Sequence, residues 1–142
     1  MLKSTTLTVT SEFPTQMLRL TEDILSFVRT CGISEGIVFV ISAHTTTGII
    51  VNEGLPCVET DIQDLLTRLA PGDFPYTHAH FLPSYGATSN NSPGHLKSTL
   101  VGNNCIFPIA GGEMVRGSAQ DVYLAEFDGP QRRHIFISAM GE

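Results

Sequence analysis

A histidine set between two apolar runs is the first residue in this chain with the chemistry of an active site. The turn His44–Gly48 follows the apolar run 37–41 and precedes the apolar run 48–51. A histidine at the end of a strand is held by a rigid scaffold and exchanges protons near neutral pH. Hydroxyl groups and a glycine backbone beside it suit an anionic oxygen, phosphate included. We predict that His44 is catalytic and that three neighbours bind substrate: Thr45, Thr46 and Thr47. A hydrogen-bonded turn with strand-forming threonines is the alternative.

Three more histidines lie in or beside an irregular segment, 71–94, that is rich in Pro, Gly, Ser and Asn. They are His78, His80 and His95. Long irregular segments in compact domains commonly form lids or binding loops, and disorder is the alternative. Neutral imidazole is a common zinc ligand, so His44, His78 and His95 are candidate ligands for zinc or another divalent metal such as magnesium. Because their spacing is not diagnostic and no HExxH motif is present, histidines in a solvated loop are an equal alternative.

Two carboxylates are candidates for chemistry, for different reasons. Asp61 and Asp64 share one broad face of an expected helix, where solvated charge is the usual explanation. Glu126 stands in an expected strand, and a buried carboxylate there needs a partner, either a metal-ligating histidine or an arginine.

Cationic and amide side chains are candidates for contacts to a phosphorylated ligand. Lys97 lies near an expected helix start, which favours an anion, although the Walker pattern is absent. Gln120 and Arg133 are candidate polar contacts to phosphate, with a solvated Arg132-Arg133 turn as the alternative.

Composition limits the class of protein. The chain has 142 residues, of which 42% are hydrophobic and 15% charged, and the length predicts one domain over residues 1–142. The formal net charge of −6 argues against broad electrostatic binding to nucleic acid or to anionic membranes. The three cysteines lack a CxxC pattern, and neither a signal peptide nor a membrane-length apolar run is present, so we expect a cytoplasmic location.

Hydrophobic periodicity predicts the elements that must position these residues. Alternation near residues 6–10 predicts a first strand, and apolar residues at three- and four-residue spacing predict helices over 17–31 and 58–69. The runs 37–41, 48–51, 105–109, 122–127 and 135–140 predict further strands, and Ser92-Pro93 predicts the start of a short helix. This order indicates an α+β domain with a mainly antiparallel sheet packed against helices.

An ordered series of motifs then resembles the YjbQ family over nearly the whole chain. The motifs are Ser42–Ile49, Val51-Asn52-Glu53, Asp61, Tyr76 with His78, Asn91 with His95-Leu96-Lys97, Gly102, Pro108-Ile109, Gln120, Glu126–Pro130 and Arg132-Arg133. The resemblance implies a trimeric α+β fold with an antiparallel sheet. It also implies a polar pocket built from His44, His78, His95, Asp61, Asn52, Glu53, Gln120 and Glu126.

The family is labelled a secondary thiamine-phosphate synthase. The resemblance therefore implies a transferase that joins a pyrimidine methyl diphosphate to a thiazole phosphate and releases diphosphate. We expect His44, Asp61 and Glu126 to be catalytic, and we expect these residues to bind substrate: Thr45, Thr46, Thr47, Asn52, Glu53, Lys97, Gln120 and Arg133. The alternatives are a metal- or phosphometabolite-binding protein, a metal-dependent hydrolase, and a purely structural homotrimer.

The chain departs from the family pattern at two places. Ser118-Ala119-Gln120 stands where members often have Thr-Trp-Gln, which weakens the expectation of an aromatic wall for the substrate. Gly94 stands where an alanine is common, and we expect it to loosen the turn before His95 because glycine adds backbone freedom.

Overall fold

Two antiparallel sheets form the body of the protein. The computed structural model describes residues 1–80 and 91–142, without the side chains of Ala79 and His80. The larger sheet has the strand order β1 (Leu2–Thr10), β8 (Arg132–Gly141), β3 (Gly36–Ser42), β5 (Asn104–Ala110) and β6 (Glu113–Met114). The smaller sheet has the order β2 (Gln16–Arg19), β7 (Asp121–Glu126) and β4 (Thr47–Asn52). Because every pairing is antiparallel and helices accompany the sheets, the predicted α+β class is confirmed.

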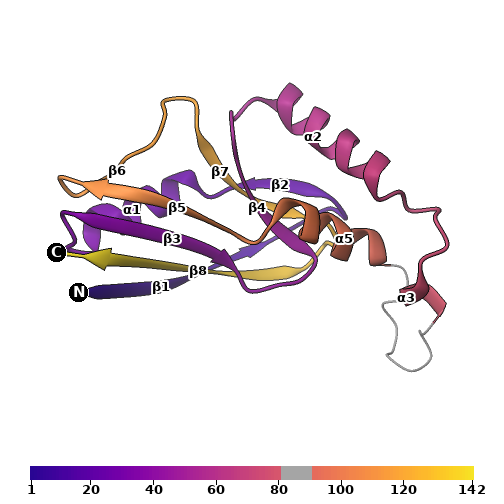
Figure 1. The fold of residues 1–142 in the computed structure, drawn as a ribbon, viewed down its shortest axis with the longest axis horizontal. Coiled ribbons are helices and arrows are strands. Elements are labelled where there is room, and N and C mark those ends of the chain that lie inside the picture. Colours follow the sequence, from indigo (N-terminus) through magenta and orange to yellow (C-terminus); the bar gives the residue numbers. More distant parts are fainter. Residues whose placement is uncertain (81–90) are drawn as a thin grey trace.

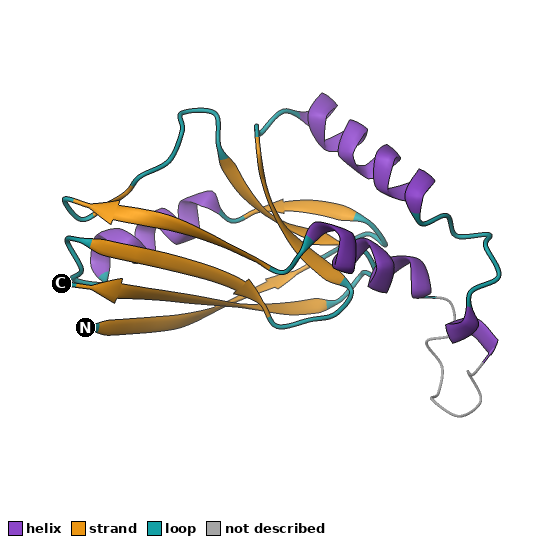
Figure 2. Cartoon of the chain, in the orientation of Figure 1, coloured by secondary structure: helices purple, strands orange, loops and turns teal. Residues whose placement is uncertain are grey.

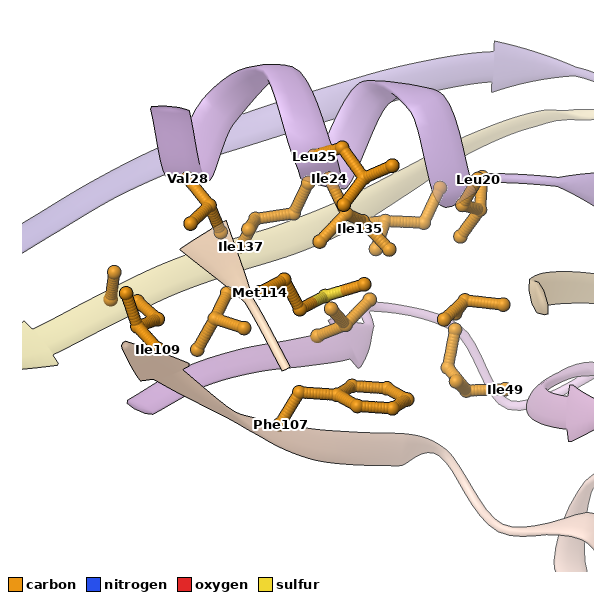
Figure 3. Close-up of a cluster of buried hydrophobic side chains, with 14 of the residues drawn as sticks. Leu20, Ile24, Leu25, Val28, Ile49, Phe107, Ile109, Met114, Ile135 and Ile137 are labelled. Atoms are coloured by element: carbon orange, nitrogen blue, oxygen red, sulfur yellow. The ribbon is translucent and has the colours of Figure 1, made fainter. Parts of the chain in front are cut away.

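The main core lies between one face of the larger sheet, the smaller sheet and helix α1 (Thr21–Thr30) (Figure 3). Alternate residues of β3, such as Val38 and Val40, are fully buried there, and Ile24 of α1 is fully buried as well. Burial of each such side chain stabilises the fold by about 1.5–3 kcal/mol. This core therefore fixes the position of β3, which ends at Ser42, just before His44.

The opposite face of the larger sheet carries apolar side chains that the described residues leave exposed. Side chains alternate between the two faces of a strand, so burial of Val38 and Val40 turns their neighbours outward. Several outward side chains are exposed: Ile41 (37%), Ile106 (54%), Phe136 (48%) and Met140 (48%). Ile41 is the cross-strand partner of Phe136. We call this set the outer apolar face.

The described residues form three further helices beside the sheets (Figures 1 and 2): α2 (Pro56–Leu69), α3 (Thr77–His80) and α5 (Ser92–Val101). Helix α5 packs on β4 beside the point where β3 ends. Helix α2 buries Leu66 but leaves Leu65 and Leu69 exposed. No helix in residues 1–80 or 91–142 is long and apolar enough to cross a membrane.

The predicted boundaries differ from the structure at the first strand, which begins at Leu2, at α3, which lies within the predicted irregular segment, and most clearly at the first helix. The apolar spacing indicated a helix from Met17 to Cys31, but residues 16–19 form β2 and the helix begins at Thr21. Met17 and Leu18 pair with Ala125 and Leu124 of β7, so pairing with a central strand overrides a helical spacing that continues across the boundary. The short strand β6 was not predicted. Residues 81–90 of the predicted binding loop lie outside the described residues.

Candidate functional site

A polar pocket of about 330 Å³ opens where β3 ends, facing the turn after β7 and the start of α5. We call it the His44 pocket. Its lining is mostly polar and comes from segments far apart in the sequence: Ala43, His44, Thr45, Thr46, Asn91, His95, Asp128, Gln131 and Arg133. Five of the predicted site residues therefore meet here, namely His44, Thr45, Thr46, His95 and Arg133.

His44 is held in one hydrogen-bonding state by the backbone of β8. The backbone N–H of His134 donates to Nε2 of His44 over 2.8 Å, so Nε2 carries a lone pair and the proton of the neutral ring lies on Nδ1. Burial lowers the pKa of His44 below its usual value, and the nearby Arg133 and His134 lower it further. His44 is therefore neutral at physiological pH, with an N–H that it can donate to a ligand.

Arg133 is fixed at the pocket by a buried carboxylate. Its Nε donates to Glu126 Oε1 over 2.8 Å, and its Nη2 donates to Glu126 Oε2 and to Thr46 Oγ1. Glu126 is fully buried and accepts two more hydrogen bonds, from Ser11 Oγ (2.6 Å) and from the backbone N–H of Asp128 (3.1 Å). The predicted need of Glu126 for a partner is met by arginine. Glu126 does not line the pocket, so its contacts indicate that it positions Arg133.

A hydrogen-bonded chain connects the pocket to His78. Asp128 Oδ2 accepts from Asn91 Nδ2 over 3.1 Å, and Asn91 Oδ1 lies 2.9 Å from His78 Nε2. Gln131 Nε2 donates to the backbone oxygen of Asp128 over 2.7 Å. The turn after β7 and the residue before α5 therefore hold His78 in place together.

A second, more apolar cavity of about 500 Å³ lies beside the first. It is lined by Tyr76, Thr77, His78, Ser92, His95 and Leu96, and we call it the His78 cavity. His95 lines both spaces, and its ring meets the ring of His78 edge-on at 5.5 Å between centroids. His44, His78 and His95 thus lie around two neighbouring cavities that share His95.

Several other predicted residues lie elsewhere in the chain. Asp61 lines a separate depression along α2 with Asp64, Thr67 and Arg68. Asn52 and Glu53 lie at the far end of β4, where Asn52 pairs with Asp121, the residue after Gln120. The six residues of β4, at about 3.3 Å each, separate this end from the His44 turn. Within one chain, these four predicted site residues therefore do not join His44.

Thr47 and Lys97 are buried and do not line the pocket. The Thr47 hydroxyl is fully buried and bonds to Ser42 Oγ over 2.5 Å, which closes the turn. The ammonium of Lys97 lies 3.4 Å from Thr67 Oγ1 and 6.0 Å from the centre of the Phe127 ring. Burial lowers the pKa of Lys97, and the side chain packs α5 against its neighbours.

The three histidines predicted as metal ligands do not form a ligand group in this structure. Among the described side chains, which do not include that of His80, no three His, Cys, Asp or Glu residues are close enough to hold one ion. Nε2 of His44 is also occupied by a backbone N–H. The donor set therefore does not fit a three-histidine site, and we derive no step through a metal.

Three residues of the pocket were given no site role from the sequence, namely Asn91, Asp128 and Gln131, although Asn91 and Asp128 stand in the family motifs. Asp128 stands in a sequence of turn-forming residues before Gly129-Pro130, so its only local signal was that of a turn.

The role of Gly94 also differs from the expectation that glycine loosens the turn before His95. A Cβ at this position would lie 2.9 Å from the Phe127 carbonyl oxygen, so glycine here permits a close approach of α5 rather than a loose turn.

Comparison with known proteins places this chain in a family. The family model described as UPF0047 protein YjbQ-like matches residues 5–142, and the chain belongs to this family, as the sequence motifs indicated. UPF0047 protein MJ1081 of Methanocaldococcus jannaschii is 33% identical over 128 residues, covering 89% of this chain and 86% of that protein. YugU of Bacillus subtilis is 32% identical over 127 residues, covering 89% of this chain and 90% of that protein.

Solved structures give the same result. A YbjQ-like protein of unknown function from Sulfolobus solfataricus superposes with a TM-score of 0.93 at 26% identity, covering 100% of this chain and 99% of that one. A YjbQ/UPF0047 protein from Clostridium acetobutylicum superposes with a TM-score of 0.85 at 29% identity, covering 96% and 99%.

Proposed function

We propose that the His44 pocket binds the phosphate group of a small metabolite, and that the chain is a transferase of the secondary thiamine-phosphate synthase type. One observation carries the binding proposal: Arg133, Thr45, Thr46 and a neutral His44 line one pocket. The proposed transferase reaction joins a pyrimidine methyl diphosphate to a thiazole phosphate, and it is inferred from the family resemblance.

Hydrogen-bond donors, more than net charge, suit the pocket to phosphate. Glu126 balances the charge of Arg133 through Nε and Nη2, and no described residue accepts a hydrogen bond from Nη1, which can therefore serve a ligand. The start of α5 lies at the same pocket through Asn91 and His95, and no acidic residue lies in its first turn. Unpaired N–H groups at a helix start favour an anion. Asp128 adds one acceptor, which suits a ligand that also carries an N–H or O–H donor.

The proposed reaction needs stabilisation of a leaving group more than a base. The bond between the methylene carbon and the diphosphate oxygen breaks, and the oxygen keeps the electron pair. The thiazole nitrogen then forms the new bond to that carbon with its own lone pair, so no proton has to be removed. Fixed donors aimed at developing negative charge are effective in such a step, and His44 and Arg133 would supply them.

A diphosphate-release assay with both substrates tests the transferase proposal. We expect release that requires both substrates and falls by about 10²-fold in His44→Ala, the usual cost of losing one such donor. The transferase proposal would be refuted if diphosphate release were no faster than without protein, or equally fast in His44→Ala. The alternative of a phosphometabolite-binding protein would then remain. The metal-dependent hydrolase gains no support from the donor set described above.

We also propose that the protein is a homotrimer. The outer apolar face supports this, because monomeric proteins rarely leave a large contiguous apolar surface in water. The low charged fraction of 15% is consistent with surface covered by identical copies. In a trimer, the His44 pocket of one copy could also be approached by residues of a neighbouring copy, namely Asp61, Asn52, Glu53 and Gln120. The cytoplasmic location stays a prediction from the sequence.

A further inference from the structure

We infer that Asp128 is a positioning residue that acts through Asn91 to fix the ring of His78, so that His78 and His44 are held in opposite neutral forms. In this arrangement His44 offers an N–H and His78 offers a lone pair. The roles given to the two histidines rest on the proposed function, whereas their hydrogen-bonding states rest on geometry alone.

The orientation of the Asn91 amide is the first step. Asp128 is a carboxylate, which only accepts hydrogen bonds at neutral pH. The amide atom of Asn91 that lies 3.1 Å from Asp128 Oδ2 must therefore be the NH₂ group. The reverse orientation would set a carbonyl oxygen against a carboxylate oxygen. Gln131 Nε2 also lies 3.4 Å from Asp128 Oδ2 and 2.7 Å from its backbone oxygen, which keeps the carboxylate in the turn.

The protonation of His78 follows from that orientation. With its NH₂ group on Asp128, Asn91 presents its carbonyl oxygen to His78 Nε2 at 2.9 Å. A carbonyl oxygen has no proton to give, so Nε2 must be the donor. In the neutral ring, the lone pair is then on Nδ1. His78 lines the His78 cavity, and no described residue donates a hydrogen bond to its Nδ1, so this lone pair can serve a ligand group that carries an N–H or O–H.

His44 has the opposite form for an independent reason. The backbone N–H of His134 donates to His44 Nε2, which places the proton of the neutral ring on Nδ1. A backbone N–H cannot be reoriented by a side-chain change, whereas the His78 form depends on two side chains. The two histidines therefore differ in what controls them, and only His78 should respond to changes at Asp128.

Long-range ¹H–¹⁵N correlation spectra of the full chain, labelled at histidine nitrogens, test this inference in the ligand-free protein. The spectra are recorded at roughly pH 8. We expect a protonated Nε2 and an unprotonated Nδ1 for His78, and the reverse for His44. A native protein in which His78 is mainly protonated at Nδ1 would overturn the inference, and this result needs no variant.

Two variants then test the part played by Asp128. In Asp128→Asn the new amide can donate or accept, so the Asn91 amide loses its fixed orientation and His78 should become a mixture of both forms. The double variant Asn91→Asp/Asp128→Asn restores an acceptor for His78 Nε2 and a donor behind it, and should restore the native pattern. An unchanged His78 pattern in Asp128→Asn would overturn the positioning role. Because no ligand is present, failure here is distinct from failure of phosphate binding.

Discussion

Arg133 and Glu126 form a two-bond ion pair inside the protein, with Nε and Nη2 of the arginine each donating to a different oxygen of the glutamate. The exposed fractions of the two side chains are 3% and 0%. A buried charge without its partner is costly, so each residue requires the other. The pair joins β7 to β8 at the floor of the His44 pocket, which links the stability of the fold to the geometry of the site.

Breaking this pair should destabilise the protein strongly. We expect Glu126→Gln and Arg133→Met each to lower the free energy of unfolding by about 3–5 kcal/mol, because each leaves a buried charge unpaired. The exposed pair of Arg29 with Glu113 provides a control, and Arg29→Gln should cost no more than about 1 kcal/mol. Urea unfolding measures all three. Equal losses for Glu126→Gln and Arg29→Gln would contradict the account.

The same pair predicts a pH dependence. Burial raises the pKa of Glu126, but hydrogen bonds from Arg133, Ser11 and the Asp128 backbone outweigh it, and the net pKa lies below the usual 4.5. A lowered folded pKa gives stability that is complete above the unfolded pKa and is lost as the pH falls through the folded one. The difference in unfolding free energy between native protein and Glu126→Gln should therefore shrink in acid. A difference that stays constant down to about pH 3 would show that the charge is not responsible.

Gly94→Ala should destabilise the start of α5 although alanine favours helices. The propensity gain is roughly 0.5–1 kcal/mol. A Cβ only 2.9 Å from the Phe127 carbonyl oxygen forces a backbone shift, however, and we expect a net loss of about 1–3 kcal/mol. Gly72→Ala is the matched control, because its Cβ would meet nothing within 4 Å. Thermal unfolding compares the two, and a stabilised Gly94→Ala would refute the close-approach explanation.

The outer apolar face predicts assembly. Light scattering on the purified chain should give three times the mass of one copy, and Phe136→Glu should shift the protein toward monomer by placing a charge in the buried contact. Ser26→Glu adds the same charge on the exposed side of α1 and should leave the mass unchanged. A native protein with the mass of one copy would refute the trimer proposal.

Local sequence patterns predicted the helices and strands well, but they did not predict how far apart these elements lie in the fold. Apolar runs at residues 37–41 and 135–140 identified β3 and β8, and Ser92-Pro93 marked the start of α5. Helical spacing at Met17 was misleading, since pairing with β7 decides the structure there.

The site was predicted in part for a similar reason. The His44 turn stood out because polar residues interrupt two apolar strands, and an expected buried position for Glu126 implied a partner, which is Arg133. Whether the predicted histidines form one ligand group, and whether Asp61 or Asn52 joins them, depends on tertiary distances that no local pattern contains. Asp128 carries only the local signal of a turn, and its contact with Asn91 joins positions 37 residues apart.

Calorimetric titration of diphosphate into the metal-free protein tests the central claim, that the His44 pocket binds a phosphorylated group. The account predicts saturable binding, weakened at least about tenfold, or about 1.4 kcal/mol, in His44→Ala. Ser26→Glu, far from the pocket on α1, should bind like the native protein. No binding to the native protein, or equal binding by native protein and His44→Ala, would contradict the account.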